Sequence, residues 1–535
     1  MRWVICTVLT ALAGIACKNG KQAPSAAQAS RGFEPARKAE IYFSTEVAGY
    51  VEPCGCTTKP LGGVQRLATV VRRGHEHRAV VDAGNLLFPP DGVNDVTREQ
   101  HILKAKILGR VYRQLGAVAL NVGPSDLADG ADFLQNLQQE GATPFVSANV
   151  RPAEETGPTI ARSFVRKIGA IKVGFTGVAP PEKIASTKAA VTVIEYAPGV
   201  ASEVKVLRDE GAEVVVVLAH LSLVDAKALA KAVPNIDVIL RAPGTPIERD
   251  PAGPVREGKV IIAEAGSQGQ HIGRLTLAFG ADAPERPLVL DDAGAAELKR
   301  RQLAERKIRA YQMEVDAWSV DPKKAEAVKA KKAQIAQIQA DLDRPLPPSP
   351  PPSGPHVRVD IVRLTEDIPS DPAMTKLLEV YYRELHAMNL TKGDTEKCAP
   401  KEGAATFVGT AKCVECHEEA YAFWKKTKHA KAWATLEDDG KHFDLTCIGC
   451  HTVGYEQAGG FCRLADVKGY EDVGCENCHG PGSIHIEDQD PSSIELEAPE
   501  STCADGCHVP EHSDAFVYEK YLREITGPGH ELDES

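Results

Sequence analysis

The sequence predicts a multidomain protein that combines an α/β domain, a helical hairpin and a mainly helical C-terminal domain. Strand-like and helix-like segments alternate from Glu40 to Phe279, and an apolar run such as Val214–Leu218 requires a sheet covered on both faces. A charged segment, Asp291–Arg344, spaces its apolar residues as a helix does. Beyond Lys401, cysteines and histidines recur at fixed spacing. With 535 residues, the chain exceeds what one hydrophobic core normally supports.

The first 17 residues have the pattern of an export signal. An apolar run from Trp3 to Ala16 follows Arg2, long enough for the apolar part of a signal peptide and too short to cross a bilayer. The stretch Leu12–Cys17 resembles a bacterial lipoprotein cleavage site, which implies lipidation of Cys17; an ordinary secretory signal cut nearby is the alternative. Both export the protein, as a periplasmic protein or a membrane-anchored lipoprotein. Residues 18–38 lack apolar periodicity and are expected to be a flexible tether.

Residues 39–290 are expected to form the α/β domain. Its strands are predicted at Ile41–Thr45, Ala79–Ala83, Ala117–Val122, Phe145–Val150, Val173–Val178, Val214–Leu221 and Val260–Ala265. Amphipathic helices are predicted at Val64–Arg73, Glu99–Leu115, Ala131–Glu140, Ala201–Asp209 and Asp225–Ala232.

Residues 291–344 are expected to form an antiparallel helical hairpin, because Asp321-Pro322 interrupts two stripes of apolar residues. A single kinked helix is the alternative, and the hairpin is expected to be a spacer or packing arm. Residues 345–400 contain a stiff polyproline linker, Pro345–Pro355, then a short strand, Val357–Ile361, and an amphipathic helix, Met374–Met388.

Residues 401–535 contain four motifs that end in Cys-His. Three have the spacing C-x-x-C-H and the fourth has one more residue between its cysteines. The eight cysteines are Cys413, Cys416, Cys447, Cys450, Cys475, Cys478, Cys503 and Cys507. This spacing attaches c-type haem through two thioethers, and the adjacent histidine becomes the proximal iron ligand. A cysteine/histidine zinc cluster is the alternative. The repetition favours a multihaem cytochrome c domain with four haem c groups.

The stretches Phe407–Cys413, Tyr421–His429 and Gly480–His485 resemble the cytochrome c-554 family of tetrahaem electron carriers. The resemblance implies helical packing organised by closely stacked haem pairs, with axial histidines at His429 and His485. The proximal ligands are expected to be His417, His451, His479 and His508. The remaining distal candidates are His442, His512 and His530. Imidazole on both sides of the iron indicates electron transfer, whereas an open position permits small-molecule chemistry. Cys398 and Cys462 remain for a disulfide.

The order of short motifs in the α/β domain resembles the 5′-nucleotidase branch of the calcineurin-like metallophosphatases. The supporting stretches are Gly62–Thr69, Val81–Gly84, Ser147–Val150, Val173–Val178, Leu218–Ser222 and Gly273–Leu275. The resemblance implies a metallophosphatase-like αββα sandwich. The family's metal-binding positions hold Glu46, Ala48, Asn85, Gly123–Asp126 and Arg241–Thr245 instead of the usual ligands, and His220 is the one imidazole ligand that remains. A two-metal phosphoesterase needs several anionic or imidazole ligands, so the fold is expected to persist without the activity.

Two thiols, Cys54 and Cys56, lie one residue apart in a Gly/Pro-rich loop after the first strand. They indicate a soft-metal or thiol/disulfide redox site, and a structural disulfide or two inert thiols are the alternatives. Sequence alone does not decide whether His220 joins them.

Charge is unevenly distributed along the chain. The net charge is −12, yet residues 401–535 hold 11 Lys and Arg against 27 Asp and Glu, so the rest is slightly basic. This acidity excludes nucleic acid as a partner and favours a redox protein with a basic docking surface. The first interpretation is an exported electron-transfer protein with an inactive phosphatase-like body. The second is a multihaem oxidoreductase acting on a small nitrogen or sulfur compound, and the third is an active exported nucleotidase.

Overall fold

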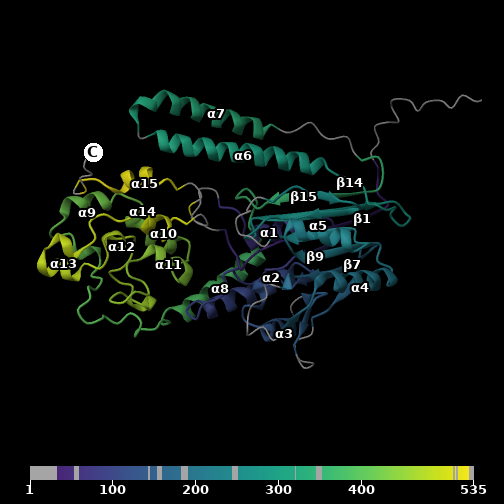
Figure 1. The fold of residues 1–535 in the computed structure, drawn as a ribbon, viewed down its shortest axis with the longest axis horizontal. Coiled ribbons are helices and arrows are strands. Elements are labelled where there is room, and N and C mark those ends of the chain that lie inside the picture. The colour runs from purple at the N-terminus through teal and green to yellow at the C-terminus, as the bar shows by residue number, and fades with distance from the viewer. Residues whose placement is uncertain are drawn as a thin grey trace, which may run out of the picture.

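The computed structural model describes residues 33–53, 60–141, 145–153, 160–181, 191–243, 251–319, 321–344, 352–509, 513, 516–528 and 530. Figure 1 shows an α/β domain on the right, a domain of short helices on the left, and a pair of long helices extending over both.

The first sheet of the α/β domain has seven strands. In spatial order they are β14 (Leu290–Asp291), β15 (His356–Arg363), β13 (His271–Phe279), β1 (Arg37–Ser44), β2 (Arg78–Asp82), β3 (Ala117–Asn121) and β4 (Phe145–Val146). Strands β1 to β4 run parallel, and β13 joins β1 antiparallel with Leu275 opposite Ile41. The carboxyl ends of β1, β2 and β3 therefore meet at one edge, where the following loops bring polar side chains together.

The second sheet has six strands. Their order is β11 (Val255–Glu257), β12 (Val260–Ala263), β10 (Val238–Ala242), β9 (Val214–His220), β7 (Ile171–Val178) and β6 (Ser163–Ile168). Strands β7, β9, β10 and β12 are parallel, so β9 ends with His220 at the carboxyl edge of this sheet. A separate antiparallel pair is formed by β5 (Val150–Pro152) and β8 (Val191–Val193).

The two sheets face each other across an apolar core, and helices cover their outer faces. Strand β9 shows the pattern: Val214 and Val216 belong to the core between the sheets, whereas Val215 and Val217 pack on the outer side. The first sheet is covered by α1 (Val64–Arg72), α2 (Arg98–Gln114), α3 (Ala131–Gln139) and α8 (Pro372–Asn389). The second is covered by α4 (Tyr196–Asp209) and α5 (Leu223–Ala232). The predicted αββα sandwich is confirmed.

Two features of this domain differ from the sequence expectation. The strand predicted at Phe145–Val150 divides into β4 and β5, and between them the Asn149 side chain donates a hydrogen bond to the C=O of Ala179 and accepts one from its N–H. Strand β15 contains the short strand predicted at Val357–Ile361, but it pairs along its length with β13 instead of belonging to a linker. The sheet thus takes in residues from beyond 290.

Helices α6 (Ala293–Trp318) and α7 (Ala325–Asp343) form the predicted hairpin, and they lie side by side in Figure 1. Asp321 caps the short turn between them, η3 (Pro322–Lys324), by accepting a hydrogen bond from the N–H of Lys323. Asp316 of α6 also pairs at 3.0 Å with Lys520 of α15 (Tyr518–Ile525). The hairpin therefore contacts the C-terminal domain as a packing arm.

The C-terminal domain consists of short helices and turns. They are η4 (Thr410–Lys412), α9 (Glu418–Trp424), η5 (His429–Lys431), α10 (Ala432–Asp438), α11 (Leu445–His451), η6 (Leu464–Asp466), α12 (Cys475–His479), α13 (Ser483–Asp488), η7 (Pro491–Ser493), α14 (Glu500–Ala504) and α15. Its apolar cluster has four buried members, Leu436, Leu445, Ile448 and Leu464. So small a cluster does not organise a domain of this size by itself. Among the described helices, none combines the length and apolar character needed to cross a bilayer.

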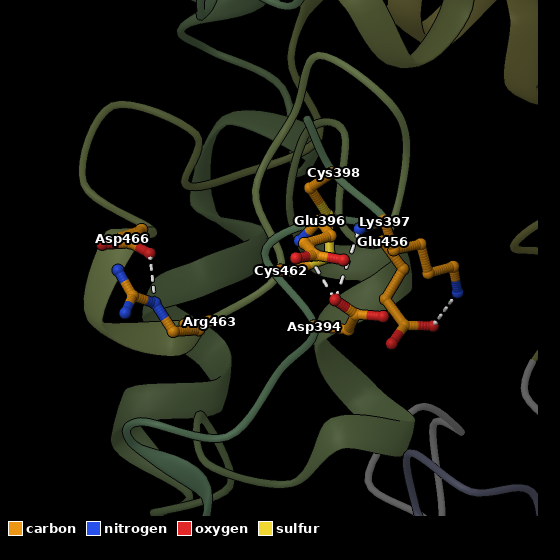
Figure 2. The surroundings of a disulfide bond; sticks show 8 residues. All are labelled: Asp394, Glu396, Lys397, Cys398, Glu456, Cys462, Arg463 and Asp466. Carbon is orange, nitrogen blue, oxygen red and sulfur yellow. Dashed lines mark hydrogen bonds and ion pairs between the residues drawn. A yellow bond between two sulfur atoms is a disulfide. The ribbon is translucent and has the colours of Figure 1, made fainter. Parts of the chain in front are cut away.

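Cys398 and Cys462 form a disulfide, the pairing that the sequence left open. Figure 2 shows it next to the ion pair of Lys397 and Glu456, which are 3.0 Å apart. The sequence separation of 64 places the first two Cys-His motifs inside the loop that the disulfide closes.

Replacing Cys398 and Cys462 with serine should lower the free energy of unfolding of the C-terminal domain by about 2–4 kcal/mol, because the unfolded chain regains the freedom of a long loop. Thermal unfolding followed by visible absorbance measures this change. A thiol-free reductant should shift the wild type toward the variant and leave the variant unchanged. Equal melting temperatures for wild type and variant would contradict the expectation.

Candidate functional site

The eight motif cysteines are thiols that are not joined in disulfides, and each is at least partly exposed. The second and third motifs lie on α11 and α12, the fourth begins on α14, and the first lies between η4 and α9. The thiol of Cys413 lies beside that of Cys475, and the thiol of Cys450 lies beside that of Cys507. The first motif therefore lies beside the third, and the second beside the fourth.

Three motif histidines each face a histidine from another part of the chain. The ring centres of His417 and His485 are 6.3 Å apart, with 26° between the ring planes. His508 and His429 are also 6.3 Å apart, at 42°. His479 and His530 are 6.0 Å apart, at 27°.

These separations fit an iron ion held between two imidazole rings. A ligating imidazole nitrogen lies about 2 Å from a metal, so two rings that share one metal have centres about 6 Å apart. Direct stacking or hydrogen bonding would bring the rings closer. The residues present therefore fit three haem irons with imidazole on both sides.

Hydrogen bonds at Nδ1 orient several of these rings. His451 donates to the carbonyl of Ala432 at 2.6 Å, and His479 donates to that of Glu495 at 2.7 Å. His485 donates in the same way to Asp490 at 3.0 Å. Because Nδ1 carries the proton, Nε2 is left unprotonated with its lone pair available to a metal. This is the tautomer that a haem ligand requires.

His451 differs from the other motif histidines, because no imidazole ring faces it at this separation within the described residues. The candidate His442 does not face a motif histidine; its ring lies 3.8 Å from the ring of Phe443. His512, another candidate, lies outside the described residues.

Glu476 is a positioning residue that the sequence analysis missed. It lies inside the third motif and is only 3% exposed. Its carboxylate accepts backbone hydrogen bonds from Val408, Gly409 and Gly482 at 2.8–3.1 Å. These contacts tie the approach to the first motif to the segment that carries His485. A charged residue between motif cysteines gave no signal, since most glutamates are solvated.

Three of the side chains expected at metal-binding positions, Glu46, Asn85 and His220, lie where β1, β2 and β9 end. The Nδ2 of Asn85 is 2.8 Å from Glu46 Oε1 and 2.9 Å from His220 Nε2. His220 Nε2 is in turn 3.1 Å from Glu46 Oε2. The three side chains are buried and in contact with one another.

The orientation of the Asn85 amide opposes metal binding. Its Oδ1 accepts a hydrogen bond from the N–H of Ser125 at 2.9 Å, so Nδ2 must face Glu46 and His220. An amide NH2 group is a donor and does not ligate a cation. Hydrogen bonds thus occupy the positions where ligand atoms would have to converge.

The neighbouring carboxylate of Asp126 is also engaged in hydrogen bonds. Asp126 accepts backbone hydrogen bonds from Asn85, Leu87 and Gly123, each at 2.8 Å. Burial raises the pKa of Asp126 to about 6, although these three donors oppose the shift. Within the described residues, His, Cys, Asp and Glu do not come together in a group of three that could hold a metal.

The structure describes only some of the other predicted site residues. Arg241 forms a buried ion pair with Glu264, so a guanidinium lies where the family has its late histidines. The end of the stretch Arg241–Thr245 (residues 244 and 245), the thiols Cys54 and Cys56, and the lipidation candidate Cys17 lie outside the described residues.

Comparisons with known proteins find two kinds of similar protein. Residues 412–480 match the family model described as cytochrome c554 and c-prime, which takes in the first three motifs. Cytochrome c-554 of Nitrosomonas europaea is 38% identical over 93 residues, covering 15% of this chain and 40% of that protein. An apyrase of Tabanus yao is 25% identical over 292 residues, which covers 47% of this chain and 51% of the apyrase. The chain spans about half or less of the length of these relatives.

Solved structures that resemble this chain include the following three. A 5′-nucleotidase precursor from Thermus thermophilus has 15% identity and a TM-score of 0.45, covering 72% of this chain and 68% of that chain. The sulfate thiohydrolase SoxB of the same species has 13% identity and a TM-score of 0.44, covering 68% of this chain and 63% of that chain. A calcineurin-like phosphoesterase from Bacillus subtilis has 19% identity and a TM-score of 0.36, covering 45% of this chain and 84% of that chain. The C-terminal part of this chain, with its Cys-His motifs, is thus similar to the cytochrome c-554 family of c-type cytochromes.

Proposed function

We propose that this protein is an exported c-type cytochrome that carries electrons through four covalently attached haems. The observation that carries the proposal is the set of three imidazole pairs, each joining a motif histidine to a distant one at the separation that an iron ion needs. Iron with imidazole on both sides has no free coordination position, which favours electron transfer over substrate binding.

The haem would supply a one-electron couple, and the chain's own residues would hold it in place. Four of the eight motif cysteines form two neighbouring pairs, Cys413 with Cys475 and Cys450 with Cys507, so haems attached at these motifs would be close to one another. Close haems exchange electrons without a mobile carrier. The small apolar cluster supports the same conclusion, because bound haems would supply the missing core.

The α/β domain is, in this proposal, a body without phosphoesterase activity that serves in docking or sensing. What supports its inactivity is the Asn85 amide, which fills the former metal position with hydrogen bonds. The acidic C-terminal domain would meet a redox protein with a basic surface, and nucleic acid is not a partner.

Export is part of the proposal, with the protein in the periplasm or anchored to a membrane through lipid at Cys17.

Cys54 and Cys56 are proposed as a redox or soft-metal thiol site. Replacing both with serine tests this: loss of bound metal or of electron-transfer rate supports the site, and a lower melting temperature alone means a structural pair.

The second candidate function is a multihaem oxidoreductase acting on a small nitrogen or sulfur compound. What favours it is His451, which no other described imidazole faces. Binding of carbon monoxide by one ferrous haem would support this candidate, and the absence of binding would exclude it.

The mature protein should carry four haem c groups. Intact mass spectrometry under denaturing conditions measures the number, because thioether bonds survive unfolding. A variant with Cys503 and Cys507 both replaced by alanine should lose one haem. A mass with two haems or fewer in the wild type would refute the cytochrome proposal.

Replacing His485 with alanine should convert one haem from low to high spin, because His417 would lose the ring that faces it across the iron. Magnetic circular dichroism measures the spin states. His386→Ala is the matched control, since the ring of His386 stacks on Phe443 at 3.5 Å and faces no motif histidine in the described structure. Unchanged spin states in both variants would reject the pairing.

Replacing Asn85 with aspartate should lower the melting temperature at pH 7. A second carboxylate beside Glu46 replaces a hydrogen-bond donor, at a cost of about 2–4 kcal/mol. The carboxylates of this pair would have raised pKa values in the folded state, so the loss should shrink as the pH falls and one of them is protonated. Melting curves at pH 5 and 7 measure both effects.

Asn235→Asp is the control for that substitution, because Asn235 shares a left-handed backbone (φ 67° against 58°) but is exposed. Neither the wild type nor the Asn85→Asp variant should hydrolyse a phosphate ester with added manganese. An unchanged melting temperature for Asn85→Asp, or metal-dependent hydrolysis by the wild type, would contradict the account.

A further inference from the structure

Helix α2 of the α/β domain contacts the helix that carries the second Cys-His motif. Gln100 of α2 is fully buried, and its Nε2 donates to Asp444 Oδ1 at 2.6 Å. Its Oε1 accepts from the N–H of Leu445 at 3.0 Å and from Asn389 Nδ2 at 2.8 Å. One buried side chain thus joins the α/β domain, the end of α8 and the start of α11.

Asp444 is the residue through which this contact acts on α11. It caps the helix by accepting a hydrogen bond from the N–H of Thr446 at 3.0 Å. Its Oδ2 lies 2.9 Å from Nζ of Lys104, one turn along α2 from Gln100, and the two side chains are 11% and 14% exposed. The cap of this helix is therefore a charged group whose counter-charge comes from the α/β domain.

The ion pair is buried and close to the haem attachment point. Burial alone would raise the pKa of Asp444, but the charge of Lys104, with its hydrogen bond and those of Thr446, holds it at about 2. Cys447 lies one turn along α11. Burial and the charge of Asp444 raise the pKa of its thiol to about 12, against the opposing effect of Lys104 and Lys441. These three charges therefore act on the atom that would join the haem.

A second polar link supports the same interface. Lys441 lies 3.9 Å from Glu52, in the loop after β1, and Glu52 also accepts a hydrogen bond from the hydroxyl of Tyr382 on α8. Val96, ahead of α2, packs on the apolar cluster that includes Leu445 and Ile448 of α11. The α/β domain thus supplies part of the surroundings of this one motif.

We propose that Lys104 is a positioning residue that sets the reduction potential of the haem attached at Cys447 and Cys450, acting through Asp444. This inference rests on the proposed function, since it requires a haem at that motif. Reduction adds an electron to the haem, so a nearby positive charge favours the reduced state and a nearby negative charge opposes it. In a buried setting such charges are weakly screened.

The test is a spectroelectrochemical titration of the full-length protein with Lys104→Met and Asp444→Asn. Lys104→Met leaves the Asp444 carboxylate uncompensated and should shift one of the four midpoint potentials to a more negative value. Asp444→Asn leaves the lysine uncompensated and should shift the same potential to a more positive value. The double variant should return close to the wild type. The haem affected should be the one absent from a variant with Cys447 and Cys450 replaced by serine.

Lys106→Met is the matched control. Lys106 lies on the same helix, is 39% exposed and sits 3.8 Å from Glu140, so its removal should leave all four potentials unchanged. Shifts of the same sign in the two single variants, or no shift in either, would overturn the proposal. If Lys104→Met fails to fold, the sign of the Asp444→Asn shift decides. Intact mass separates the two levels, because a wild type without haem at Cys447 and Cys450 refutes the proposed function itself.

Discussion

The C-terminal domain depends on one geometric constraint, the separation of about 6 Å between facing imidazole rings. His417, His479 and His508 each meet it with a partner from a different short segment. These segments have few apolar side chains to hold them, and the buried cluster is confined to four residues near α11. Carbonyl acceptors at Nδ1, the buried carboxylate of Glu476 and the Cys398–Cys462 disulfide then fix the segments that carry the rings.

The α/β domain is organised by a different principle. Its stability comes from apolar strands packed between two helix layers, as the alternating sides of β9 show, and this core does not need a metal. The polar residues at the strand ends could therefore change without loss of the fold. Asn85 donates a hydrogen bond to Glu46, His220 Nε2 lies close to both side chains, and Arg241 forms a buried ion pair with Glu264. The domain provides a surface for the C-terminal domain, because Gln100 and Lys104 of α2 contact Asp444 at the start of α11.

The extent to which sequence predicts this structure follows from the range of the interactions. The Cys-His motifs, the apolar run of β9 and the break at Asp321-Pro322 are local patterns, so the four candidate haem motifs, the covered sheet and the hairpin could be recognised in the sequence. The joining of β15 to β13 and the break at Asn149 depend on distant hydrogen bonds and could not. His429 and His485 were expected from a resemblance, but their pairing with His508 and His417 required coordinates. The Gln100–Asp444 contact crosses 344 residues and left no pattern in the sequence.

The most direct test of this account is electron paramagnetic resonance of the oxidised protein, with the spins of each ferric species quantified per chain. The three imidazole pairs predict low-spin ferric signals that amount to at least three haems per chain, whatever the state of the haem at His451. High-spin ferric signals from two or more haems per chain would contradict the account, because at least one facing pair would then not hold an iron.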